Sequence, residues 1–157
     1  MAYVAGFAGA STQIDREAGF RAGLAEAGQT LFARAEGNFD YKTAQVAARE
    51  LFATSKRPDA VFVGNDHMAF AVMDVLRFEL GLKVPDDVSV VGFDDVPPAA
   101  WPAYNLTTFR QRVDQMVAET VTMLTTSIGA EQPKVSRVVL AGELVVRGST
   151  RRHGGGP

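Results

Sequence analysis

Short apolar segments alternate with amphipathic ones along most of the chain. A strand is predicted wherever such a run is rich in β-branched, aromatic or other apolar residues, namely at 2–7, 30–35, 59–64, 88–93 and 106–109. The run at 88–93 carries no charged side chain, which is typical of a parallel strand covered on both faces. The segment 135–147 is predicted to form two further short strands.

Amphipathic periodicity predicts helices between these strands. Apolar residues over 44–52 recur at i, i+3, i+4, i+7 and i+8, the clearest helical pattern in the chain. An earlier helix is predicted with Ser11 or Thr12 as its N-cap, and a later one with Asp66 as its N-cap. A last apolar stripe at helical spacing lies within 113–128. Strands that alternate with helices predict an α/β fold, a doubly wound parallel sheet with helices on both faces.

Composition excludes several classes of function. The 157 residues suffice for about one domain, and 46% hydrophobic and 22% charged residues are typical of a globular protein. With no cysteine and two histidines, we expect no disulfide, no thiolate catalysis, no metal site and no cofactor. A net charge of −2 disfavours DNA binding by this chain alone. The chain has no apolar run of membrane-spanning length and no basic stretch before its first apolar segment, so we expect a cytoplasmic protein.

Polar and aromatic residues follow the predicted strands, where parallel sheets bind ligands. Asn65 and Asp94 come directly after strands, Phe39 follows one within a few residues, and Ser11 and Arg16 lie in and just after the first loop. A cation near a helix N-terminus opposes the helix dipole, so Arg16 needs another reason, such as a ligand with two oxygens. The amide of Asn65 donates and accepts hydrogen bonds, which matches a hydroxyl group.

Each of these residues also has a structural interpretation. Arg16 could pair with Asp15 or a nearby carboxylate, Phe39 could belong to the core, and Asp94 with Asp95 could form a capped turn. No nucleophile elbow and no cluster of general acids and bases is present, so no catalytic residue is predicted. The residues favour a binding domain for a small polar ligand over an enzyme.

Several motifs together resemble the effector-binding region of LacI/GalR-type transcriptional regulators. They are PDAVFVGNDHMAFAVMDVLRFELGLKVPDDVSVVGFDD (58–95), LTTFRQ (106–111) and VVRGST (145–150), with support from STQIDREAGFRAGLAEAG (11–28) and EGNFDYKTA (36–44). The resemblance covers nearly the whole chain except its tail. It implies a periplasmic-binding-protein-like fold, mainly its C-terminal lobe, with an effector bound in the cleft between two lobes.

The resemblance also implies a binding site. An arginine, an amide and a carboxylate would hold the oxygens of the effector, an aromatic ring would pack on it, and a glutamine at the crossover between lobes would add a contact. With a further serine, the implied set is Ser11, Arg16, Phe39, Asn65, Asp94 and Gln111. Such a site suits a sugar or another hydroxylated ring.

The resemblance divides the chain as well. Residues 1–110 would form the C-terminal lobe, 111–130 a crossover helix toward the other lobe, 131–150 returning strands and 151–157 a mobile tail. DNA would be contacted only through an N-terminal helix-turn-helix head that this sequence lacks. An exposed apolar stripe within 113–128 favours a homodimer. The alternatives are a lobe of a periplasmic sugar-binding protein of a transport system and an enzyme built on a doubly wound sheet.

Overall fold

The computed structural model describes residues 1–128 and 137–151, so the predicted tail beyond Arg151 and part of the predicted crossover lie outside the described residues. The strands are β1 (Ala2–Ala5), β2 (Ala33–Glu36), β3 (Ala60–Val63), β4 (Ser89–Asp94), β5 (Thr107–Arg110) and β6 (Glu143–Val145). The helices are α1 (Ser11–Glu26), α2 (Tyr41–Phe52), α3 (Asp66–Asp74) and α4 (Val113–Ser127), with a π-helical turn η1 (Val75–Glu79) and a 3-10 turn η2 (Pro97–Ala100).

One sheet contains these strands in the order β2-β1-β3-β4-β5-β6. The pairs from β2 to β5 are parallel, and β6 runs antiparallel to β5. The chain moves from β1 to β2 on one side and then to β3 on the other. The strand order therefore reverses at β1, and such a switch point is where doubly wound sheets bind ligands.

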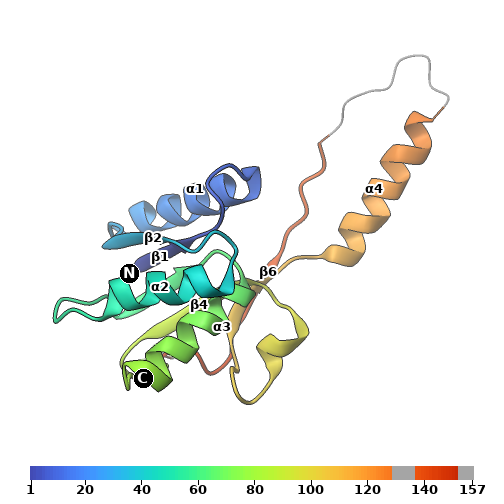
Figure 1. The fold of residues 1–157 in the computed structure, drawn as a ribbon. Coiled ribbons are helices and arrows are strands. Elements are labelled where there is room, and N and C mark those ends of the chain that lie inside the picture. Colours follow the sequence, from blue (N-terminus) through green and yellow to red (C-terminus); the bar gives the residue numbers. More distant parts are fainter. Residues whose placement is uncertain (129–136, 152–157) are drawn as a thin grey trace, which may run out of the picture.

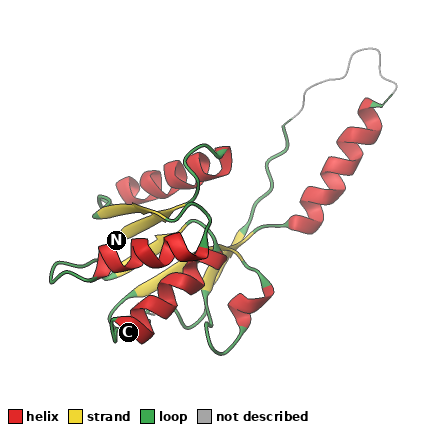
Figure 2. Cartoon of the chain, viewed as in Figure 1, coloured by secondary structure: helices red, strands yellow, loops and turns green. Residues whose placement is uncertain are grey.

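Helices lie on both faces of the sheet (Figures 1 and 2). α1 lies on one face, and α2 with α3 lies on the opposite face. This follows from the handedness of the connections, because a right-handed crossover to the left of β1 and one to its right place their helices on opposite faces. The architecture is the one that the alternating pattern predicts.

The core lies between the sheet and the α2–α3 layer. Val61, Val63 and Val90 project from the strands onto Phe52 and Leu76, and all of these side chains are buried. The predicted periodicity of α2 is confirmed, because its buried residues are Ala44, Ala47, Ala48, Leu51 and Phe52. This packing fixes the positions of β3 and β4 and therefore of the loops at their carboxyl ends.

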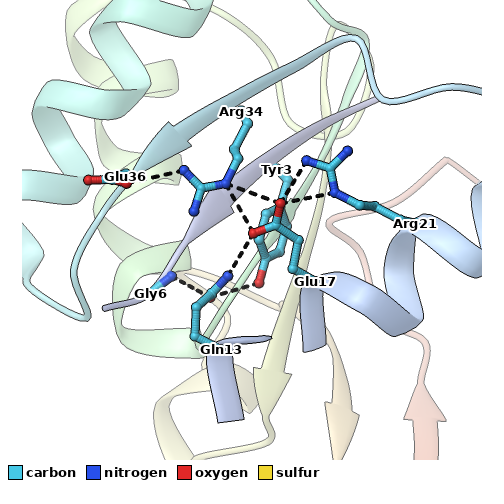
Figure 3. A network of polar contacts seen from close by, with 7 residues as sticks. All are labelled: Tyr3, Gly6, Gln13, Glu17, Arg21, Arg34 and Glu36. Carbon is cyan, nitrogen blue, oxygen red and sulfur yellow. Dashed lines mark hydrogen bonds and ion pairs between the residues drawn. The ribbon is translucent and has the colours of Figure 1, made fainter. Parts of the chain in front are cut away.

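A polar network joins α1 to the other face (Figure 3), beside the packing of Phe20 on Tyr3 and Phe62. The buried Gln13 accepts hydrogen bonds on Oε1 from the Tyr3 hydroxyl at 2.9 Å and from the Gly6 amide at 2.6 Å. Its Nε2 donates to Glu17 at 3.0 Å, and Glu17 in turn accepts from Arg34 of β2 at 3.0 Å. Gln13 therefore fixes the start of α1 against the end of β1.

Two predicted helix caps were wrong. The N-cap of α1 is Ala10, which makes no side-chain cap bond, so neither Ser11 nor Thr12 caps this helix. The N-cap of α3 is Asn65 rather than Asp66, which is the first residue of the helix. Adjacent Asn and Asp residues are both good caps, so the sequence alone does not choose between them.

α4 and the segment that returns from it extend away from the sheet (Figure 1). No residue of α4 is buried, and its apolar stripe is exposed by 58% at Val113, 57% at Val117, 54% at Val121 and 60% at Leu124. Within 137–151, β6 is the single strand, so the prediction of two returning strands was wrong there, while 135–136 lie outside the described residues.

Candidate functional site

Arg16 extends from α1 across the carboxyl ends of the central strands. Its Nη1 donates to the carbonyl of Gly64 at 2.6 Å, and its Nη2 donates to Oδ1 of Asp94 at 3.4 Å. The guanidinium carbon lies 3.9 Å from the centroid of the Phe93 ring, which is a cation–π contact. The carboxylate with which Arg16 pairs is thus Asp94 and not Asp15, so the structural interpretation of Arg16 as one half of an ion pair is confirmed. Arg16 joins the ends of β3 and β4 from the α1 side of the sheet.

Asp94 is the acceptor at the centre of this cluster. Gln111, just after β5, donates from Nε2 to Oδ1 of Asp94 at 2.7 Å. In residues 1–128 and 137–151 the side-chain hydrogen bonds of Asp94 both end on Oδ1, and the side chain is 29% exposed. Oδ2 therefore keeps its capacity to accept hydrogen bonds. Burial raises the pKa of Asp94, while Arg16 and Gln111 act to lower it.

The backbone at Asp94 and Asp95 is strained. Both have positive φ, 121° at Asp94 and 57° at Asp95, in a region that side chains other than glycine rarely adopt. The two carboxylates have different partners, since Asp94 bonds to Arg16 and Gln111 and Asp95 does not. Asp95 forms ion pairs with Arg110 at 2.5 Å and with Arg147 at 2.7 Å. Burial acts to raise the pKa of Asp95, but the two arginines outweigh it and hold that pKa below its ordinary value.

Asn65 uses part of its hydrogen-bonding capacity within the chain. Its Oδ1 accepts from the backbone amide of Met68 at 2.9 Å and so caps α3. In the described part of the chain no side chain accepts from its Nδ2. The cap engages one of the two lone pairs of Oδ1, so the prediction that Asn65 both donates to and accepts from a ligand stays a prediction. Asn65 presents a donor beside Gly64, to which Arg16 is bonded.

Phe39 and Ser11 lie at the end of β1 and beyond it. Phe39 is half-buried and packs against the core, and its backbone has φ of 56°. A Cβ atom built on Gly6 would lie 2.1 Å from the Phe39 ring, so glycine at that position admits the ring over the end of β1. Ser11 is exposed at the start of α1, and its side chain makes no hydrogen bond within the described residues. The structure therefore brings together Arg16, Asp94 and Gln111 beside Asn65, but it does not join Ser11 to them.

An apolar groove of about 580 Å³ lies next to Arg16 on the α1 face of the sheet. Aromatic rings line it: Phe93 and Phe109 stack with 5.1 Å between their centroids, and the rings of Phe20 and Phe62 are tilted to each other with 5.0 Å between theirs. The sequence analysis missed this groove because it took the strands to be covered on both faces. The signal was present, since Phe62, Phe93 and Phe109 alternate with residues of the opposite face.

In the described ranges, no group of three or more His, Asp or Glu side chains could hold a metal ion. None of the helices described is both long enough and apolar enough to span a membrane.

Comparison with protein families decides where this arrangement belongs. Residues 1–150 match the family described as periplasmic binding protein-like domain. The chain belongs to this family. Among curated proteins it is similar to the HTH-type transcriptional repressor PurR of Vibrio campbellii, with 36% identity over 140 residues, 88% of this chain and 42% of the relative. It is also similar to the probable HTH-type transcriptional repressor ExuR of Bacillus subtilis, with 33% identity over 117 residues, 74% of this chain and 35% of the relative.

Solved structures of periplasmic binding protein-like domains agree. A complex of the transcriptional regulator CelR with cellobiose matches with a TM-score of 0.87 and 34% identity, over 94% of this chain and 46% of that one. The dimeric Lac repressor with an 11-residue C-terminal deletion matches with a TM-score of 0.85 and 28% identity, over 95% of this chain and 54% of that one. The resemblance to the effector-binding region of LacI-type regulators is thus confirmed. The chain spans about half the length, or less, of these relatives, which are transcriptional regulators rather than enzymes.

Proposed function

We propose that this chain is the effector-sensing portion of a LacI-type transcriptional regulator and that its effector is a sugar or a related hydroxylated molecule. The observation that carries the proposal is the convergence of Arg16, Asp94 and Gln111, from three separate elements, at the carboxyl ends of the sheet. Asn65 belongs to the same proposed site, and Phe39 and Ser11 are proposed at its β1 side.

The donors and acceptors of the site support a ligand that carries hydroxyl groups. Oδ2 of Asp94 can accept a hydrogen bond and Nδ2 of Asn65 can donate one, and the two residues lie at the ends of the neighbouring strands β4 and β3. A hydroxyl can donate to the first group and accept from the second, which neither a purely cationic nor a purely anionic ligand does. The aromatic rings beside Arg16 and at Phe39 suit the apolar face of a ring.

Regulation would follow from closure of a two-lobed sensor. In the proposed mechanism, residues 1–110 form one wall of the effector cleft, and 111–130 and 131–150 pass to and from the other lobe. An effector that binds the closed arrangement more tightly shifts the populations of the two arrangements, and the attached DNA-binding heads respond. Like the dimeric Lac repressor, the protein is proposed to act as a homodimer, in the cytoplasm, and without catalysis.

Calorimetry tests the binding proposal. The chain is titrated with a panel of pentoses, hexoses, cellobiose, nucleosides and purine bases. Binding is expected for a hydroxylated member, with at least a tenfold loss in Asp94→Ala and in Arg16→Ala. The matched controls Asp59→Ala and Arg49→Ala remove the same charges elsewhere. Asp59 lies before β3, at the opposite end of the sheet, and Arg49 lies on α2. Binding that survives Asp94→Ala and Arg16→Ala unchanged, or turnover of any panel member, would overturn the proposal.

A further inference from the structure

The structure assigns a positioning role to Asp66 and Thr108, an inference that rests on the proposed function of Asp94. Together these residues hold the two consecutive backbone N–H groups that follow Asp94, and so they fix the direction in which its carboxylate points. Neither side chain is exposed, since both residues have 0% relative accessibility.

Asp66 reaches the strained turn from the start of α3. Its Oδ2 accepts from the backbone amide of Val96 at 3.0 Å, and its Oδ1 accepts from the hydroxyl of Thr108 at 2.5 Å. The Thr108 hydroxyl oxygen in turn accepts from the backbone amide of Asp95 at 3.4 Å. One carboxylate therefore holds two successive amides of the turn, one of them directly and the other through a hydroxyl group.

The surroundings are shaped for this carboxylate. A Cβ atom built on Gly92 of β4 would lie 2.2 Å from Oδ1 of Asp66, so the glycine leaves the space that the carboxylate occupies. A buried carboxylate is unfavourable unless it is hydrogen-bonded, and the side-chain bonds of Asp66 go to the turn and to β5. An apolar residue would fill this space at a smaller cost in desolvation, so the carboxylate is present for what it holds.

The turn needs such a restraint. Positive φ at two adjacent residues that are not glycine persists only when the surrounding structure imposes it. If the amides of Asp95 and Val96 were released, the backbone would relax toward ordinary φ and the Asp94 carboxylate would turn away from Arg16 and Gln111. Asp66 and Thr108 would thus determine the geometry of the site without touching the ligand.

The test uses a buried threonine pair on β5. Thr108→Val keeps the shape of the side chain and removes the hydroxyl, whereas Thr108→Ser keeps the hydroxyl. Thr107→Val is the matched control, because Thr107 is equally buried on the same strand but its hydroxyl oxygen accepts from the Arg147 amide at 2.8 Å and contacts Thr150. All of these variants are neutral replacements, so none changes the charge near Asp94.

The measurement is the pH titration of the Asp94 carboxyl carbon by ¹³C-detected NMR on the full chain without ligand. Burial raises the pKa of Asp94 in the wild type. We expect this raised pKa to persist in Thr108→Ser and in Thr107→Val, and to return toward the ordinary range in Thr108→Val as the carboxylate turns to water. Thermal unfolding monitors the stability of each variant. If Thr108→Val does not fold, Thr108→Ala replaces it, because alanine places no methyl group against the Asp66 carboxylate.

An Asp94 titration in Thr108→Val that matches those of Thr108→Ser and Thr107→Val would overturn the positioning role. A shift of equal size in Thr107→Val would do the same, because it would reflect general loosening of β5. The titration needs no ligand, so its result is independent of the calorimetric panel. Failure of the proposed function shows in the calorimetry, and failure of the positioning role shows in the titration.

Discussion

The strained backbone at Asp94 predicts that two variants which lose the same contacts differ in stability. Asp94→Ala removes the carboxylate and keeps a Cβ atom at φ of 121°, whereas Asp94→Gly removes both the carboxylate and the strain. The two variants lose the same contacts with Arg16 and Gln111. The difference between their free energies of unfolding therefore isolates the conformational cost at this position.

The magnitude follows from two opposing terms. A residue held in a sparsely populated φ region costs about 1–3 kcal/mol, which Asp94→Gly relieves. Glycine makes the unfolded chain more flexible than alanine does, and this lowers stability by about 0.4–1 kcal/mol. Asp94→Gly is therefore expected to be more stable than Asp94→Ala by about 1 kcal/mol. For a two-state domain of this size, that difference corresponds to a rise in Tm of about 2–4 °C.

Urea unfolding followed by circular dichroism measures the difference, and calorimetry with the ligand panel measures the loss of binding in both variants. Asp59, which does not have positive φ, is the control position. There the order should be reversed, with Asp59→Gly less stable than Asp59→Ala. If Asp94→Gly proves no more stable than Asp94→Ala while the Asp59 pair behaves as expected, the turn is not strained and the reasoning about Asp94 fails.

Three further predictions concern Asn65, Asp94 and the exposed stripe of α4. Asn65→Asp keeps the acceptor that caps α3 and removes the donor, so it should weaken ligand binding at nearly wild-type stability. Asn65→Ala should weaken binding and also lower the free energy of unfolding in urea by about 1 kcal/mol, because it removes the cap. Equal stability of the two variants would refute the capping role. Because burial raises the pKa of Asp94, the folded chain binds that proton more tightly than the unfolded chain does. The free energy of unfolding of the wild type, relative to that of Asp94→Asn, should therefore rise as pH falls from 7 toward the ordinary carboxyl range near about 4. A difference between the two free energies that does not change with pH would contradict this prediction. Val121→Asp on the exposed stripe should reduce the apparent mass in light scattering if that stripe mediates self-association, while Glu119→Asp should not; an unchanged mass in Val121→Asp would exclude the stripe.

Much of the fold could be predicted because it depends on local patterns. The strand–helix alternation follows from hydrophobic periodicity, and the handedness of crossovers then restricts the layers. The periodicity of α2 was recognised because its helix buries one continuous stripe against the sheet. The caps of α1 and α3 were not, because Ser11, Thr12, Asn65 and Asp66 all favour cap positions and only the backbone conformation decides among them.

The sequence predicts where the site lies but not how its polar atoms are oriented. Ligands bind at the carboxyl ends of parallel strands, which places Arg16 and Asp94 in one region, and the structure shows an ion pair between them. The orientation of each polar atom depends on partners that the chain brings from far away. The arginine partners of Asp95 lie on β5 and after β6, and neither pairing has a local signal in the sequence.

The least predictable feature is the bonding of the Asp66 carboxylate. Asp66 looks in the sequence like a helix cap, which is a local role, yet its carboxylate is bonded to the turn after β4 and to Thr108 on β5. A cap residue could be exchanged for serine or asparagine with little effect on distant loops. A carboxylate that holds two amides of a strained turn could not, because neither replacement accepts through two equivalent oxygens. In the proposed role, position 66 needs a carboxylate for the turn after β4 in addition to its favourable place in the first turn of α3, while Asn65 caps that helix.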